Sequence, residues 1–242
     1  MHRSASRLTR ILACAAVPVM LVVAGCSSDS DGEGSGASPD KGKAAASATP
    51  LPTQSTRTVE PAKFAKLPDV CKTVSAKTTA ALVPKAKAKN GTQATSSDTS
   101  SRGGCSWNGL QDKGTKGSQY RWLDVSLYRY ESDASLGSGQ ERAQQNLAKE
   151  VAKLEATEGA KKVRTTDAPG IGDEAQTVAY DLRKTDEDFK YASVVARTGN
   201  VLVLLTYNGT GYAGASTPGD DAFMDSAVKA AKEAVAAVAA AN

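Results

Sequence analysis

Residues 189–207 of the chain are FKYASVVARTGNVLVLLTY. Two apolar runs flank Thr198-Gly199-Asn200, and because Gly and Asn tolerate positive φ, this tripeptide is typical of a tight hairpin turn. The sequence therefore predicts paired strands over Phe189–Arg197 and Val201–Tyr207. The stretch Val201–Leu205 is apolar at every position, which favours a central strand buried on both faces.

Other strands are predicted on either side of this hairpin in the sequence. Residues 120–130 alternate, with Leu123, Val125 and Leu127 on one face and the aromatic residues on the other. Residues 175–183 alternate in the same way, and a short strand is expected at Cys105-Ser106-Trp107. The sheet should therefore consist of antiparallel strands.

Helices are predicted from capping and periodicity. Ser138-Gly139-Gln140-Glu141 has the Ser-x-x-Glu form of a capping box, and an apolar stripe follows it as far as Gly159. A short helix is expected over Ser75–Val83, stopped by Pro84, and a long C-terminal helix should begin near Asp220. Strands with segregated helices indicate an α+β fold, an antiparallel β-sheet with helices packed on one side.

The first 25 residues have the form of an export signal. Three arginines precede an apolar run, Ile11–Ala24, that is shorter than the roughly 20 residues a membrane-spanning helix needs. Val23-Ala24-Gly25-Cys26 then resembles the bacterial lipobox, in which the cysteine thiol receives a diacylglycerol after cleavage. We therefore expect a lipoprotein that is held at the membrane through a lipid on Cys26. The alternatives are a secreted protein with an incidental cysteine and an uncleaved signal anchor.

The mature chain divides into a tether and one domain. Residues 26–61 are rich in Ser, Gly, Ala, Thr, Pro and Asp and have too few large apolar residues to fold, so a disordered tether is expected. Residues 62–242 suit a single extracytoplasmic domain. The protein should therefore stand at the outer face of the cytoplasmic membrane.

Two cysteines remain in the predicted domain, Cys71 and Cys105. In an oxidising compartment an even pair forms a disulfide by default. The alternative is a redox-active pair, but such cysteines normally lie close together, as in Cys-x-x-Cys. We expect the disulfide to be structural and to staple the single domain.

Composition excludes several functions. Cleavage would remove three of the 30 basic residues and leave 27 against 26 acidic ones, which gives no electrostatic case for nucleic acid. The one histidine, His2, would also be removed, so neither a Ser-His-Asp mechanism nor the usual zinc site is available. We expect no enzyme activity, no metal and no cofactor.

Two local motifs give only weak evidence for a function. Gly209–Gly214 matches G-x-G-x-x-G, but Ser216–Gly219 follow where a helix should open, so a flexible loop is expected. The acidic run Asp186–Asp188 lies between two predicted strands and is typical of a solvated turn. Neither motif predicts nucleotide binding or hydrolysis.

The aromatic face of residues 120–130 is the candidate ligand site. A lipid, a glycan or a small molecule could stack against the rings of Trp122, Tyr128 and Tyr130, which share this face with Tyr120. The alternatives are that these rings lie under a helix or brace the sheet as cross-strand pairs.

Three short motifs carry a family resemblance: Cys71, Cys105-Ser106-Trp107 and Gly170-Ile171-Gly172-Asp173-Glu174-Ala175. With them the chain resembles actinobacterial lipoproteins that share a domain of unknown function. It is more distantly similar to the extracellular sensor domain of mycobacterial serine/threonine kinases. The resemblance to the lipoproteins implies a cell-envelope location and no known catalysis. The similarity to the sensor domain implies a sheet with helices on one side and a cleft.

The sequence thus predicts a membrane-anchored lipoprotein of the cell envelope whose domain is a non-enzymatic ligand-binding or sensing module. The ligand would be an envelope lipid, a glycan or a small molecule. The alternative is an interaction module that docks an envelope protein and has no small ligand.

Overall fold

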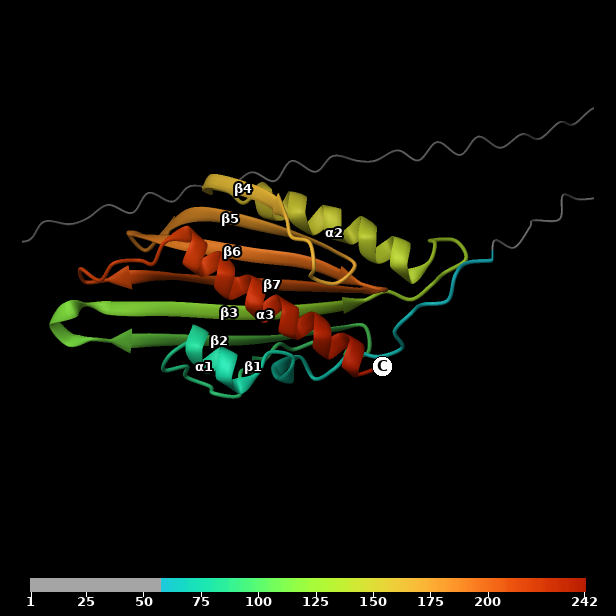
Figure 1. Ribbon diagram of the computed structural model, residues 1–242, viewed down its shortest axis with the longest axis horizontal. Helices are drawn as coiled ribbons and strands as arrows, with labels where there is room; N and C mark the ends of the chain where they lie inside the picture. The colour runs from blue at the N-terminus through green and yellow to red at the C-terminus, as the bar shows by residue number, and fades with distance from the viewer. Residues whose placement is uncertain (1–57) are drawn as a thin grey trace, which may run out of the picture. The chain divides into compact units, whose positions relative to one another are not determined.

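The computed structural model describes residues 58–242, which belong to one compact unit (Figure 1). The predicted signal peptide, Cys26 and nearly all of the predicted tether lie outside the described residues. The unit is an antiparallel sheet of seven strands in the order β1-β2-β3-β7-β6-β5-β4. The strands are β1 (Thr92–Gln93), β2 (Arg102–Asp112), β3 (Ser118–Arg129), β4 (Lys161–Asp167), β5 (Glu174–Lys184), β6 (Glu187–Thr198) and β7 (Val201–Tyr212).

The predicted hairpin lies at the centre of this sheet. Thr198 pairs with Val201 across a two-residue turn in which Gly199 has a φ of 54°. Asn200 is fully buried, and its side chain bonds the backbone of Phe64 and Tyr130, which ties the start of the domain to the turn. As predicted, the apolar run Val201–Leu205 belongs to the middle strand of the sheet.

The main core lies on one face of the sheet, under α1 (Ala76–Leu82) and α3 (Asp220–Ala240). Inward-facing side chains of β3 and β7, such as Leu123, Val125 and Val203, meet Phe223 and a run of buried alanines on α3. Small side chains let the long helix approach the sheet closely, and in Figure 1 α3 crosses the strands. Tyr207 fixes α1 by donating a hydrogen bond to the carbonyl oxygen of Leu82, 2.7 Å away.

The third helix, α2 (Gly139–Glu155), begins with the predicted capping box at Ser138 and Glu141. Its buried residues Leu147 and Val151 pack in a second cluster with Val195 and Leu202. These strand residues alternate with Val194 and Val203 of the main core, so α2 covers part of the opposite face. The predicted α+β fold, an antiparallel sheet with one disulfide, is confirmed, and α1 and α3 pack on one side of the sheet as predicted. The difference is α2, which adds a second, smaller core on the other side.

The disulfide joins Cys71, in the 3₁₀ turn Val70–Lys72, to Cys105 on β2, with 5.1 Å between the Cα atoms. Cys105 is buried in the main core. The bond therefore staples the N-terminal segment to the sheet, as predicted.

Four strands differ from the sequence prediction. β1 was not predicted, because it has only two residues and both are exposed. β4 was not predicted, because all seven of its residues are exposed and no apolar alternation marks it. β2 is much longer than Cys105–Trp107, since its glycines and polar residues hide the strand signal. β7 runs on to Tyr212, so the prediction of a loop is wrong over Gly209–Tyr212. The two strands lie very close together here, because a Cβ at Gly209 would be 2.3 Å from the carbonyl oxygen of Tyr120. Glycine has no Cβ and permits this close pairing.

Candidate functional site

The face of the sheet that carries α2 is only partly covered. Tyr128 and Tyr130 lie against the α2 cluster, and the Arg142 guanidinium of α2 lies 5.8 Å from the centre of the Tyr130 ring. Tyr130 therefore lies beside α2, where the alternative of aromatic residues under a helix would place it. Trp122 and Tyr120, on the same face of β3, lie outside this cluster.

Beyond α2, five aromatic side chains gather around a hollow of about 520 Å³, here called the aromatic hollow. Its lining residues are Tyr120, Trp122, Asp124, Lys184, Thr185, Phe189, Tyr191, Asn208 and Tyr212. They come from β3, β6 and β7, from the end of β5 and from the β5–β6 turn. The volume is in the range of about 300–1,000 Å³ that small-molecule sites occupy.

The rings differ in how they are held. Phe189 is buried and makes edge contacts with Tyr120 and Tyr212, at centroid distances of 6.0 and 6.3 Å. Tyr191 stacks on Tyr180 at 4.7 Å, which fixes its ring beside the α2 cluster. Trp122 is 37% exposed and has no ring partner among the described residues. Its indole is therefore the free aromatic surface of the site.

Polar groups stand among these rings. Asn208 lies opposite Trp122 in the β3–β7 register, and its side-chain amide bonds no described residue. Asp124 accepts a 3.4 Å hydrogen bond from Ser126, but burial outweighs that bond and raises the pKa of the Asp124 carboxyl. Lys184 donates to the Tyr191 hydroxyl, 2.8 Å away. The hollow thus offers an amide, a carboxylate and an ammonium group around an aromatic floor.

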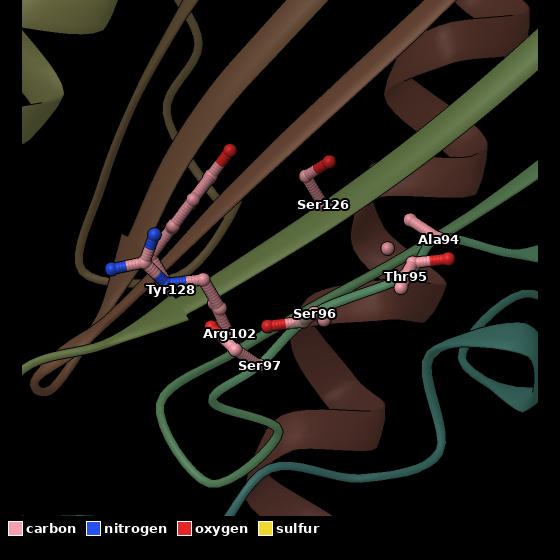
Figure 2. Close-up of a pocket in the computed structure, with 9 residues that line it drawn as sticks. Ala94, Thr95, Ser96, Ser97, Arg102, Ser126 and Tyr128 are labelled. Atoms are coloured by element: carbon pink, nitrogen blue, oxygen red, sulfur yellow. The ribbon is translucent and has the colours of Figure 1, made fainter.

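A second hollow, of about 320 Å³, continues along β3 and is here called the serine hollow (Figure 2). Ser126 and Tyr128 of β3 line it, together with Arg102 of β2 and the loop residues 94–97. Because Asp124 and Ser126 lie two residues apart on one face of β3, the two hollows adjoin.

The predicted ligand residues are therefore divided between three places. Trp122 lines the aromatic hollow, Tyr128 lines the serine hollow, and Tyr130 lies beside α2. The prediction missed Phe189, Tyr191 and Tyr212, although the alternation of Phe189 and Tyr191 in β6 was a signal that they share a face. Asn208 could not be found, because only the β3–β7 register places it beside Trp122.

Residues 58–242 contain no group of three or more His, Cys, Asp and Glu side chains that could hold a metal ion. Nor does any helix within that range have the length and apolar character needed to cross a membrane.

No family model matches the chain and no curated protein matches it, so the two resemblances inferred from sequence motifs gain no support. Among solved structures the chain is similar to the crystal structure of LpqN, involved in cell envelope biogenesis of Mycobacterium tuberculosis. The two share 15% identity at a TM-score of 0.33, over 53% of this chain and 68% of that one. A likeness this low carries no functional conclusion.

Proposed function

We propose that the protein is a non-enzymatic ligand-binding module of the cell envelope, anchored through a lipid on Cys26, and that it binds a sugar-containing ligand in the aromatic hollow. The observation that carries the proposal is the exposed Trp122 indole, set on a sheet face among four other aromatic residues. Ligand sites typically combine apolar and aromatic walls with a few polar groups, and this hollow does so.

A sugar fits the chemistry of the lining better than a purely apolar ligand. A pyranose ring has a flat face of C–H groups, which can stack on an indole, and a rim of hydroxyl groups. The unbonded amide of Asn208 and the carboxylate of Asp124 supply acceptors and a donor for those hydroxyls. An acyl chain would leave these polar groups desolvated and unpaired, which costs binding free energy.

The test uses residues 58–242, which retain every described element and the disulfide. Calorimetric titration with peptidoglycan disaccharide, cellotriose and maltotriose should give saturable binding of at least one of them. Trp122→Ala should weaken that binding at least about tenfold, because loss of a stacked aromatic surface removes about 1.4 kcal/mol or more. Leu136→Ala is the matched control, since Leu136 is a 60% exposed apolar residue that lines neither hollow.

Two results would contradict the sugar proposal. One is the absence of binding by a folded, disulfide-bonded protein to all three sugars. The other is equal weakening by Trp122→Ala and Leu136→Ala. A protein that bound no sugar but crosslinked in cells through Trp122 to one envelope protein would favour the interaction module instead.

The anchor is tested separately. Cells fed an alkyne fatty acid should incorporate it into the full-length protein, and Cys26→Ser should abolish the label, because only the thiol forms the thioether. Loss of label should also move the protein from the membrane fraction to the soluble fraction, since two or three acyl chains give stable anchoring. Unchanged labelling of Cys26→Ser would contradict the lipobox assignment.

A further inference from the structure

A second pair of hollows lies on the other face of the sheet, between α1 and the loop 84–91. One has a volume of about 450 Å³ and the other about 440 Å³. They share five lining residues, namely Ala76, Thr79, Lys89, Asn90 and Trp107. We refer to the two together as the α1 groove.

Trp107 of β2 lies at the bottom of the α1 groove. Its side chain is 2% exposed, and its indole Nε1 has no hydrogen-bond acceptor among the described residues. A buried N–H group without an acceptor costs about 1–3 kcal/mol, so buried tryptophans usually find a partner. Gly91, with a φ of 80°, passes directly over the ring: a Cβ there would lie 2.7 Å from Trp107 Cε2. A hydrogen-bond donor without an acceptor thus lies beneath the closely packed loop that forms one wall of the groove.

The surroundings of the α1 groove are strongly basic. Residues 62–91 contain seven lysines and a single acidic residue, Asp69, and all seven lysines are exposed. Asp69 is already paired with Lys72, at 3.0 Å. Lys85 and Lys89, which line the groove, form no ion pair with a described residue. The Glu233 carboxylate of α3 lies near one part of the groove, where it accepts hydrogen bonds from the Ser75 N–H and the Thr78 hydroxyl. It forms no ion pair with Lys85 or Lys89, so these two lysines keep an unpaired positive charge.

The wall between these cations is apolar. Ala76 and Ala80 of α1 face the groove, and Val83 and Ala86 continue the wall past the end of the helix. A ligand that satisfied all of these features would need an apolar chain with an anionic oxygen acceptor at one end.

We propose that the α1 groove binds a single-chain anionic amphiphile of the fatty-acid type. Its carboxylate is held by Lys85, Lys89 and the Trp107 indole N–H, and its chain lies along Ala80, Val83 and Ala86. Because Nε1 is closed off from solvent, binding includes a shift of the segment Lys89–Gly91 that uncovers it. This site lies on the opposite face from the aromatic hollow and does not depend on the proposed sugar ligand.

Indole NMR signals test the proposal directly. The chain has two tryptophans, so ¹⁵N-labelled residues 58–242 give two indole signals, and Trp122→Phe assigns them. Decanoate should shift the Trp107 signal downfield and saturably, as expected when an N–H gains a charged acceptor, and should leave Trp122 unmoved. Decanol, which has a similar chain and no charge, should bind several-fold more weakly.

Variants that lack the two lysines test whether their charges hold the carboxylate. Lys85→Met with Lys89→Met should weaken decanoate binding about tenfold, the effect of losing charge-assisted hydrogen bonds. Lys63→Met with Lys66→Met is the matched control, because it removes two exposed lysines of the same segment that do not line the groove. Binding by this control should be unchanged.

Three outcomes would overturn the proposal. The first is a Trp107 signal that decanoate does not move in a folded protein. The second is equal affinity for decanoate and decanol, which would show that no anion site exists. The third is a decanoate response confined to Trp122, which would place the ligand in the aromatic hollow.

Discussion

Replacing the buried Asn200 by alanine should destabilise the domain far more than the number of atoms removed suggests. The Asn200 Oδ1 accepts from the Phe64 N–H at 2.7 Å, and its Nδ2 donates to the carbonyl oxygens of Phe64 and Tyr130 at 3.0 and 2.8 Å. Each such bond contributes about 0.5–1.5 kcal/mol, and the buried groups left behind lose their partner. The expected loss for Asn200→Ala is about 2–4 kcal/mol in the free energy of unfolding.

Asn242 provides a control with the same chemistry at the surface. Its side chain bonds Ala65, Lys66 and Val238 through four contacts of 3.0–3.1 Å, but the residue is exposed. Water replaces these bonds when the side chain is removed, so Asn242→Ala should cost less than about 1 kcal/mol. Both substitutions act on the same N-terminal segment, and burial is the main difference between them.

Urea denaturation of residues 58–242, followed by circular dichroism, measures both losses under one protocol. The two variants should share the m-value of the parent protein, which shows that the same surface is exposed on unfolding. Equal losses within about 0.5 kcal/mol would refute the reasoning, because burial would then not decide the cost. A loss below about 1 kcal/mol for Asn200→Ala would refute it as well.

Two further predictions concern the disulfide and the ion pairs of Asp220 with Lys190 and Arg164. Replacing both Cys71 and Cys105 by alanine should lower the free energy of unfolding by about 3–4 kcal/mol, from the 34-residue separation in the chain-entropy model, and a urea midpoint unchanged from the parent would contradict this. A hydrogen bond from Lys190 lowers the pKa of Asp220 below its ordinary 3.8, so this carboxylate stabilises the fold above pH 3.8, and the contribution is lost as the pH falls through the lowered pKa. Asp220→Asn should therefore lower the melting temperature at pH 7 and have a smaller effect at pH 3; an equal effect at both values would contradict the ion-pair reasoning.

The sequence was sufficient wherever the structural signal is local. The turn at Gly199 and the capping box at Ser138 depend on a few neighbouring residues, and both are in the structure. Strand β3 was predictable because its apolar side chains alternate over the whole element. The disulfide followed from having one pair of cysteines in the predicted domain.

Features that depend on pairing between distant strands were not predictable. Strand β4 lies at the edge of the sheet with every residue exposed, so no apolar period marks it. The aromatic hollow needs the β3–β7 register to bring Asn208 beside Trp122, and it needs α2 to stop short of Trp122. The alternation of residues 120–130 predicted the aromatic face of β3, but it did not predict which of the aromatic rings a helix covers.

Ligand capture from the envelope itself tests the central claim most directly. Residues 58–242 would be incubated with an envelope glycan and metabolite extract and analysed by native mass spectrometry beside Trp122→Ala. The aromatic-hollow account predicts a stoichiometric added mass, containing sugar, on the parent protein and its loss from Trp122→Ala. No added mass on a folded, disulfide-bonded parent, or the same added mass on both proteins, would contradict it.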